Sequence, residues 1–139
     1  MTLDSRVKLR WTVETRRITP MQPLAIHHVS INVSDLHASF AFYTEVLGGT
    51  PRDDRPDFGF GGAWINFGGQ QLHLIEAAVP GNLGQHFAIQ VADIRATIEE
   101  LRAKGLTVSD AIPVATNLQA FLDDPCGNAI ELHEVGAGV

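Results

Sequence analysis

Two stretches of the chain alternate polar and apolar residues in the same order. The first, HVSINVSD, covers residues 28–35, and the second, HFAIQVAD, covers residues 86–93. Each begins with histidine and ends with aspartate before residues at helical spacing. Period-two alternation predicts a strand with one buried face, and an aspartate in that place favours the start of a helix. The chain therefore contains an internal repeat, with an offset of 58 residues between His28 and His86.

The same order of elements follows each copy. In the first copy, apolar spacing and turn residues predict a strand over 24–34, a helix over 36–47, a short strand within 51–57, and strands over 58–67 and 70–76. In the second they predict a strand over 86–92, a helix from 94 that stops at Gly105, and strands over 106–109, 114–123 and 129–134. Each unit is β-α-β-β-β. We expect an α+β fold in which the two units form a cup-shaped mixed sheet with helices outside.

Residues 1–23 stand apart from the repeat. Apolar residues alternate with charged or polar ones over 7–13, which is typical of an edge strand that covers a neighbour or a second subunit. A leader outside the folded domain is the alternative. Residues 24–139 are expected to form a single domain, with its units at 24–77 and 84–135.

Composition and charge narrow the class of protein. Of the 139 residues, 45% are hydrophobic and 19% are charged, as in ordinary globular proteins. Cys126 is the single cysteine, which excludes a disulfide framework and a cysteine-based zinc site. No stretch approaches the roughly 18 apolar residues of a membrane span and no secretory signal is evident, so a cytoplasmic location is expected. Residues 24–139 carry five basic and fourteen acidic groups, which argues against nucleic-acid binding.

Four residues with metal-binding side chains occupy equivalent positions in the two units. His73 follows His28 by 45 residues, and Glu131 follows His86 by 45 residues. In the predicted strands the apolar residues fall on the face beneath the helices, so the four side chains would share the opposite, polar face. Metal sites need several convergent ligands. We therefore predict one shared metal site in the cup.

The other histidines have simpler explanations. A histidine in a strand is more often a hydrogen-bonded structural residue than a ligand. His27 has the apolar parity, and His37 would lie on the surface in the first turn of a helix. His133 shares the parity of Glu131, but strand alternation alone explains its position, so we expect it at the rim of the cup.

Four stretches carry a family resemblance: HHVSINVSDLHASFAFYTEVLGG, QLHLIE, HFAIQVADI and FLDDPCGNAIELHE. They resemble the vicinal oxygen chelate superfamily, which includes glyoxalase I, bleomycin-resistance proteins and extradiol dioxygenases. The resemblance spans residues 24–135 and implies paired β-α-β-β-β units around a divalent metal. Its ligand positions fall on His28, His73, His86 and Glu131. The reaction is less closely specified, because this superfamily hosts many chemistries on one scaffold.

The ligand set suits Zn, Ni, Co or Fe, since three imidazoles and one carboxylate are poor ligands for Mg or Ca. It matches no familiar branch completely. The position of His73 is typically Glu in glyoxalase I, and it is normally not a ligand in extradiol dioxygenases. The resemblance favours a metal-dependent, glyoxalase-like lyase or isomerase that acts on a small substrate with adjacent oxygens through a metal-stabilised enediolate.

Glu131 is the candidate catalytic base, because a carboxylate can leave a metal and accept a proton. A permanent ligand role for Glu131 is equally open. A ring-cleaving dioxygenase and a bleomycin-resistance-like binding protein are the alternative functions. Arg52 and Arg55 either hold a substrate carboxylate or are solvated surface charges.

Each unit supplies two of the four ligands, so a complete site needs two units, taken from one chain or from two. The resemblance to glyoxalase I favours pairing across chains. We therefore expect a homodimer with two equivalent sites.

Overall fold

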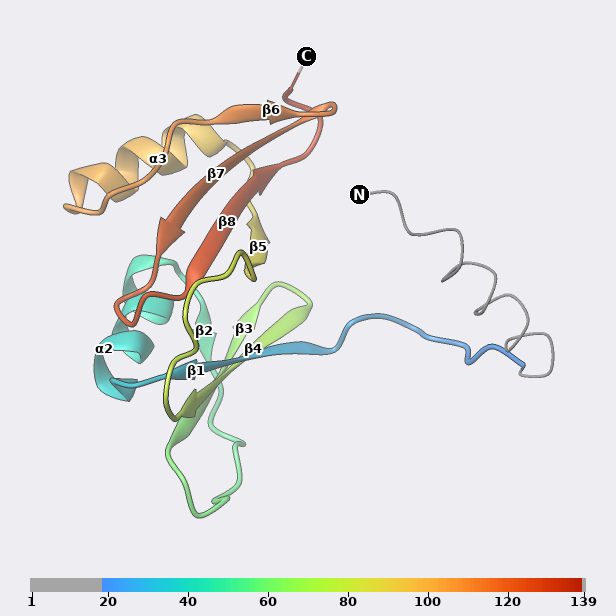
Figure 1. The fold of residues 1–139 in the computed structure, drawn as a ribbon, viewed down its shortest axis with the longest axis vertical. Coiled ribbons are helices and arrows are strands. Elements are labelled where there is room, and N and C mark those ends of the chain that lie inside the picture. The colour runs from blue at the N-terminus through green and yellow to red at the C-terminus, as the bar shows by residue number, and fades with distance from the viewer. Residues whose placement is uncertain (1–18, 139) are drawn as a thin grey trace.

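The protein is described by a computed structural model, which covers residues 19–138. The strand expected over residues 7–13 lies outside this range. Residues 19–27 have no regular secondary structure and lead away from the rest of the chain toward the N-terminus (Figure 1). Over residues 19–138, no helix has the length and apolar character that a bilayer crossing requires.

The first unit has the expected order of elements. They are β1 (His28–Val33), α2 (Leu36–Ala41), the π-helix η1 (Phe42–Val46), β2 (Thr50–Pro51), β3 (Gly62–Phe67) and β4 (Gln70–Glu76). The sheet order is β1-β4-β3-β2, with β1 and β4 parallel and the other pairs antiparallel. β3 begins later than residue 58, because the Phe60 carbonyl accepts from Arg55 and Gly59 has a φ of +80°.

The second unit repeats this topology. Its elements are β5 (Phe87–Gln90), α3 (Ile94–Ala103), β6 (Ile112–Val114), β7 (Asn117–Asp123) and β8 (Ala129–Glu134). The sheet order is β5-β8-β7-β6, again with one parallel pair, β5 and β8. The two four-stranded mixed sheets are open rather than closed, and the α+β prediction is confirmed.

One predicted strand of the second unit is wrong. Residues 106–109 form no strand, and the chain reaches β6 only at Ile112. The carbonyl of Val108 accepts from the guanidinium of Arg102 on α3, at 2.7 Å from Nη2, and of these residues only Ser109 is bonded to β7, through its N–H to the Phe121 carbonyl at 2.9 Å. The expected strand over 114–123 is also divided into β6 and β7, where Ala115 adopts a φ of +50° at the turn.

Both helices begin where the repeat places its aspartates. The side chain of Asp35 accepts from the Ala38 N–H at 3.0 Å, and that of Asp93 accepts from the Ala96 N–H at 3.0 Å. Each carboxylate thereby satisfies a backbone donor that has no partner within its helix. The first helix changes after Ala41 from α to π geometry, which the apolar spacing did not predict.

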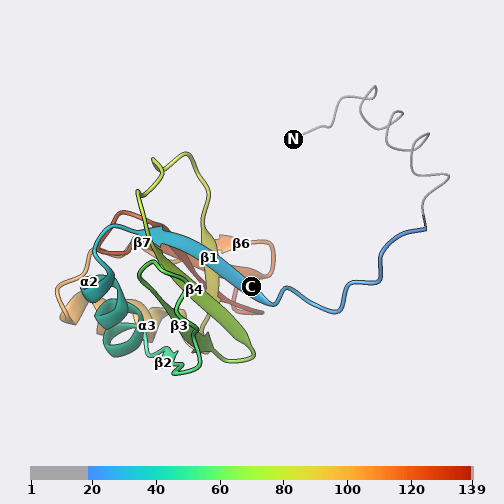
Figure 2. The same cartoon turned by 90° about the horizontal axis from the view of Figure 1, so that it is seen from below.

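The helices lie on one side of the sheets (Figure 2), and the core fills the space between them. The apolar positions of β4, β7 and β8 are buried there, as expected, and those of β1 and β5 pack against this core. The largest fully buried side chains of the core are Tyr43, Ile65, Leu72, Leu74, Ile94, Ile130 and Leu132. The opposite face of each sheet carries the polar positions of the repeat, and none of the helices within residues 19–138 lies over it (Figure 1).

Polar bonds join the two units. The hydroxyl of Tyr43 in η1 donates to Asp124 Oδ2 at 2.7 Å, across a separation of 81 residues. The side-chain amide of Asn128 donates to the Asn32 carbonyl at 2.9 Å. These bonds attach the turn between β7 and β8 to the first unit.

Candidate metal centre

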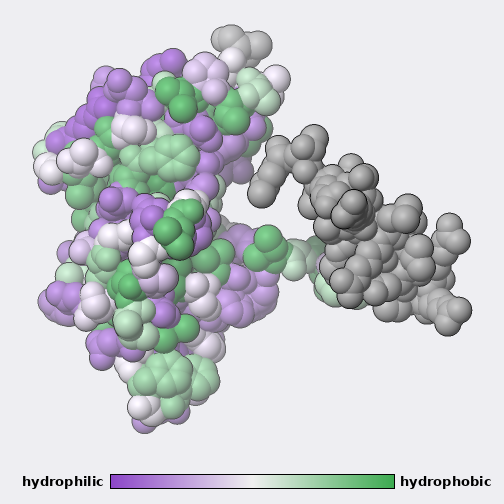
Figure 3. All heavy atoms as spheres, viewed as in Figure 1, coloured by the Kyte–Doolittle hydropathy of each residue, from purple (hydrophilic) through white to green (hydrophobic). Residues whose placement is uncertain are grey.

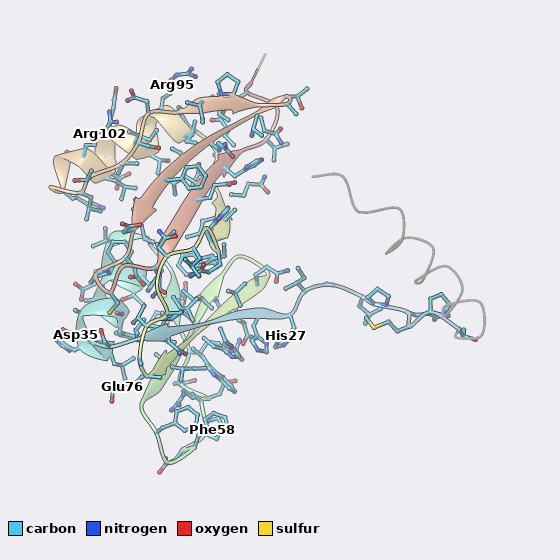
Figure 4. The ribbon with its side chains drawn as sticks, in the orientation of Figure 1. His27, Asp35, Phe58, Glu76, Arg95 and Arg102 are labelled. Carbon is cyan, nitrogen blue, oxygen red and sulfur yellow. The ribbon has the colours of Figure 1, made fainter. Side chains whose placement is uncertain are left out.

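His28 and His73 lie together on the polar face of the first sheet. Their rings stack with centroids 4.0 Å apart. β1 and β4 pair in parallel, and Ser30 of β1 lies opposite His73 of β4. His28 therefore lies two residues before the register partner of His73. His28 Nδ1 lies 2.9 Å from His27 Nδ1, which leaves the Nε2 of His28 outside that bond. Figure 4 marks this end of β1 by His27, on the side away from α2.

The surroundings of His73 favour its neutral form. Partial burial lowers the pKa of this imidazole, and the nearby His28, His27, Arg52 and Arg55 lower it further. A neutral imidazole is the form that binds a metal. Its Nε2 is 2.9 Å from Gln71 Oε1, so ligation through Nε2 requires the amide of Gln71 to move.

His86 and Glu131 form the equivalent pair in the second sheet. β5 and β8 pair with Ala88 opposite Glu131, so His86 again sits two positions before the partner of the second residue. His86 Nε2 is 3.3 Å from Glu131 Oε1. His86 Nδ1 is 2.9 Å from the Gly84 carbonyl, which fixes the ring with Nε2 directed at the carboxylate.

This second pair fits a cation. If Nδ1 of His86 donates its proton to the Gly84 carbonyl, then Nε2 and the carboxylate of Glu131 are two acceptors that face each other, and a proton or a metal ion must lie between them. Glu131 is only 9% exposed. A buried carboxylate needs such compensation, because burying an unpaired charge is costly.

His133 lies closer to the candidate metal ligands than the sequence suggested. Its Nδ1 is 2.8 Å from Glu131 Oε2, so Glu131 lies between two imidazoles. The rings of Phe121 and His86 are nearly perpendicular, with centroids 5.4 Å apart. His133 has the same parity as Glu131, and Phe121 is the register partner of Glu131 in β7. Strand parity was therefore the signal for His133, whereas only the register of β7 against β8 identifies Phe121.

Within one chain the predicted ligands are present as two separate pairs. Among residues 19–138, no three histidine, cysteine, aspartate or glutamate side chains are grouped so that they could hold a metal ion. The two pairs belong to different sheets. A complete site of four ligands within one chain is therefore not formed, and assembly from two chains stays a prediction.

The two candidate substrate arginines differ. Arg52 binds both carboxylate oxygens of Asp54, at 2.9 and 2.6 Å, which also lowers the pKa of the Asp54 carboxyl. Arg55 instead lies over the rings of Phe58 and Phe60, at 5.0 and 5.4 Å from their centroids. Arg52 is thus occupied by a neighbour, whereas Arg55 lies against aromatic rings.

Comparison with known proteins supplies the family. A family model described as the Glyoxalase/Bleomycin resistance protein/Dioxygenase superfamily matches residues 25–132. Lactoylglutathione lyase from Haemophilus influenzae is 33% identical over 125 residues, which cover 80% of this chain and 93% of that protein. A lactoylglutathione lyase from Arabidopsis thaliana is 32% identical over 124 residues, but the match covers 78% of this chain and only 44% of the plant protein.

The fold is also that of solved structures. An antibiotic binding protein from a Streptomyces species superimposes with a TM-score of 0.72 at 23% identity, covering 84% of this chain and 99% of that one. The family model covers most of the described residues, and the bacterial lyase matches over nearly its whole length. The resemblance predicted from the repeat is confirmed. The chain belongs to the Glyoxalase/Bleomycin resistance protein/Dioxygenase superfamily.

Proposed function

We propose that the protein is a divalent-metal-dependent, glyoxalase-like lyase or isomerase that acts on a small substrate with adjacent oxygens. Its metal would be held by His28 and His73 of one chain and by His86 and Glu131 of a second. Two copies would then form a homodimer with two equivalent sites, as closed two-fold symmetry requires.

The equivalence of the two pairs carries this proposal. In both sheets the two candidate ligands occupy the same register. Their side chains are also in contact. The rings of His28 and His73 stack with centroids 4.0 Å apart, and His86 Nε2 lies 3.3 Å from Glu131 Oε1. Neither pair alone supplies enough ligands for a metal, but one of each supplies four. The similarity to lactoylglutathione lyases supports the same reaction class.

The residues have distinct roles in this proposal. A bound divalent ion would supply Lewis-acid polarisation of the two substrate oxygens. Glu131 would accept the proton from a carbon that bears one of these oxygens and return it to the adjacent carbon, since its carboxylate is buried and ends at this centre. His133 would hold Glu131 in place through the 2.8 Å hydrogen bond. Burial of Glu131 excludes bulk water from the proton that it moves.

A binding protein that sequesters a small molecule is the second candidate function. The observation in its favour is the ring of Trp64, which stacks on His73 with centroids 4.6 Å apart. An aromatic wall can hold a ligand without chemistry. The two candidates differ in turnover: the enzyme converts substrate with its metal bound, whereas the binding protein returns its ligand unchanged.

Subunit mixing tests the shared site. The His28→Ala/His73→Ala variant and the His86→Ala/Glu131→Ala variant should each bind no stoichiometric divalent metal. After subunit exchange, the mixed dimer should regain one complete set of ligands and bind metal, measured by elemental analysis. His37→Ala is the control, because this exposed histidine on α2 faces no candidate ligand and should leave metal binding unchanged. A monomer in light scattering, or no metal in the mixture, would refute the proposal.

The reaction class needs an assay of its own. Metal-loaded protein should convert the hemithioacetal of methylglyoxal and glutathione or a related adjacent-oxygen substrate, and removal of the metal by a chelator should abolish turnover. Catechols test the dioxygenase alternative. Metal binding without turnover of either kind would favour the binding protein.

A further inference from the structure

A row of aromatic side chains leads outward from His73. Beyond the stack of Trp64 on His73, the ring of Phe58 lies 6.2 Å from that of Trp64, and Phe60 stacks on Phe58 at 5.6 Å. Phe58 and Phe60 belong to the loop between β2 and β3 and are each 50% exposed. Figure 3 shows hydrophobic residues at this lower end of the molecule, and Figure 4 labels Phe58 there.

A guanidinium completes this wall. Arg55 lies over both phenylalanine rings and donates to the Phe60 carbonyl at 3.1 Å. Over the described range 19–138, Arg55 has no carboxylate at ion-pair distance, unlike Arg52. One of its five N–H donors is used by the Phe60 carbonyl, so the planar group still has donors for an anion.

Two of the nearby acidic side chains are turned to other partners. Asp54 is bound by Arg52, and Asp57 accepts from the Gly59 N–H at 2.8 Å. Asp53 is exposed, where solvent and salt screen its charge. These contacts leave Arg55 as the charge that faces the rings.

The rings, Arg55 and His73 line one hollow, which is open to solvent on one side. It has a volume of about 190 Å³, and its lining includes Ser30, Arg55, Phe58, Phe60, Trp64 and His73. A cavity of about 150 Å³ is known to hold benzene. The hollow therefore has room for one aromatic ring. His73, a residue of the proposed metal centre, forms part of its lining.

We propose that this hollow binds an aromatic carboxylate, with its ring against Trp64 and Phe58 and its anionic group on Arg55. Stacked rings select a planar conjugated group over a saturated one of the same size. A guanidinium selects a carboxylate over a neutral amide, because the charged acceptor makes the stronger hydrogen bonds. This proposal rests on the proposed function in one respect: the aromatic carboxylate would be a substrate that is held beside His73.

Three small probes test both selectivities. Benzoate carries ring and charge, benzamide carries the ring alone, and cyclohexanecarboxylate carries the charge alone. In a Trp11→Phe background, Trp64 is the single tryptophan, so its fluorescence reports binding next to His73. We expect benzoate to bind about tenfold more tightly than either of the other probes. Equal affinities, or no binding of millimolar benzoate, would overturn the proposal.

Two variants identify the groups. Arg55→Gln should weaken benzoate about tenfold, to the affinity of benzamide, and leave benzamide unchanged. Phe58→Leu should reduce the preference for benzoate over cyclohexanecarboxylate. Arg95→Gln is the matched control, because Arg95 is exposed on α3 in the other unit and should leave all affinities unchanged (Figure 4). Circular dichroism and melting curves confirm that each variant is folded.

The same titrations separate this subsite from the metal proposal. They are made on protein treated with a chelator, so benzoate binding that depends on Arg55 supports the subsite whether or not metal is later found. If the exposed rings instead contact a second copy, Phe58→Ser should dissociate a dimer in sedimentation and leave benzoate binding unchanged. That result would overturn the subsite.

Discussion

Replacing Tyr43 by phenylalanine removes one hydroxyl from the contact between the two units. Tyr43 is fully buried and Asp124 is 5% exposed. The carboxylate of Asp124 accepts four hydrogen bonds: from the Tyr43 hydroxyl at 2.7 Å, from the Cys126 and Asn128 N–H groups at 2.8 and 2.9 Å, and from the Asn128 side chain at 2.9 Å. The substitution leaves three of them and keeps the ring, so no cavity forms.

The expected loss is that of one hydrogen bond to a charged group, about 2 kcal/mol of the free energy of unfolding. For a domain of this size the melting temperature should fall by about 8 °C, at roughly 4 °C per kcal/mol. Thr44→Val is the matched control, because it removes a hydroxyl from the same helix that bonds only the local Phe40 carbonyl. Its unfolding free energy should change by no more than about 0.5 kcal/mol.

The effect should also depend on pH. Burial raises the pKa of Tyr43 above its ordinary value of 10.0, and the charge of Asp124 with its hydrogen bond raises it further. Above about pH 10 the unfolded chain loses the phenolic proton and the folded chain keeps it, so the folded state binds more protons. Its stability therefore falls as pH rises, by up to about 1.4 kcal/mol per pH unit from this group. The advantage of wild type over Tyr43→Phe is complete below pH 10 and shrinks above it.

Urea denaturation followed by circular dichroism, at about pH 8 and about pH 11, measures both effects. Tyr43 is the single tyrosine of the chain, so ultraviolet absorbance reports its ionisation directly. Phenolate should form only as the protein unfolds. Equal unfolding free energies for wild type and Tyr43→Phe at about pH 8 would refute the bond, and phenolate in the folded protein near pH 10 would refute the raised pKa.

Two further substitutions test local structure. Asp93→Ala should cost about 1 kcal/mol through the lost cap of α3 and leave metal binding unchanged; a melting temperature equal to that of the exposed control Glu99→Ala would contradict it. Gly49→Ala should cost about 1–3 kcal/mol, because the new methyl would lie 2.6 Å from Ile65 Cγ2 in the core. Gly69 has open space around it, so Gly69→Ala should have the melting temperature of wild type. Equal melting temperatures for the two glycine variants would show that the core accommodates a methyl group at residue 49.

The sequence was sufficient for features that depend on local periodicity. Alternation places the apolar residues of each strand on one face, and this is why Leu72 and Leu74 are buried while His73 between them is not. The caps at Asp35 and Asp93 were predictable for the same reason, because a cap needs only the residues of its own first turn.

Features that depend on distant contacts were not predictable in this way. The backbone at Val108 has strand-like residues, but the Arg102 guanidinium takes its carbonyl. The bond between Tyr43 and Asp124 joins positions 81 residues apart, and nothing in either local pattern marks the pair. Arg55 fell in the expected connection over 51–57 and Phe58 at the start of the expected strand over 58–67, and only the path of the loop brings them beside His73.

Register explains why the sequence yields pairs of ligands more readily than a complete site. Parallel pairing inside each unit places Ser30 opposite His73 and Ala88 opposite Glu131. Because the sequence repeats, the second unit has the same register as the first. The meeting of the two pairs depends instead on which surfaces of two units face each other. In the part of the chain that the structure describes, no strand ladder connects the two sheets, so periodicity carries no information about that meeting. The mixing of complementary variants is therefore the decisive experiment, because it measures the one relation that neither the repeat nor the fold of a single chain determines.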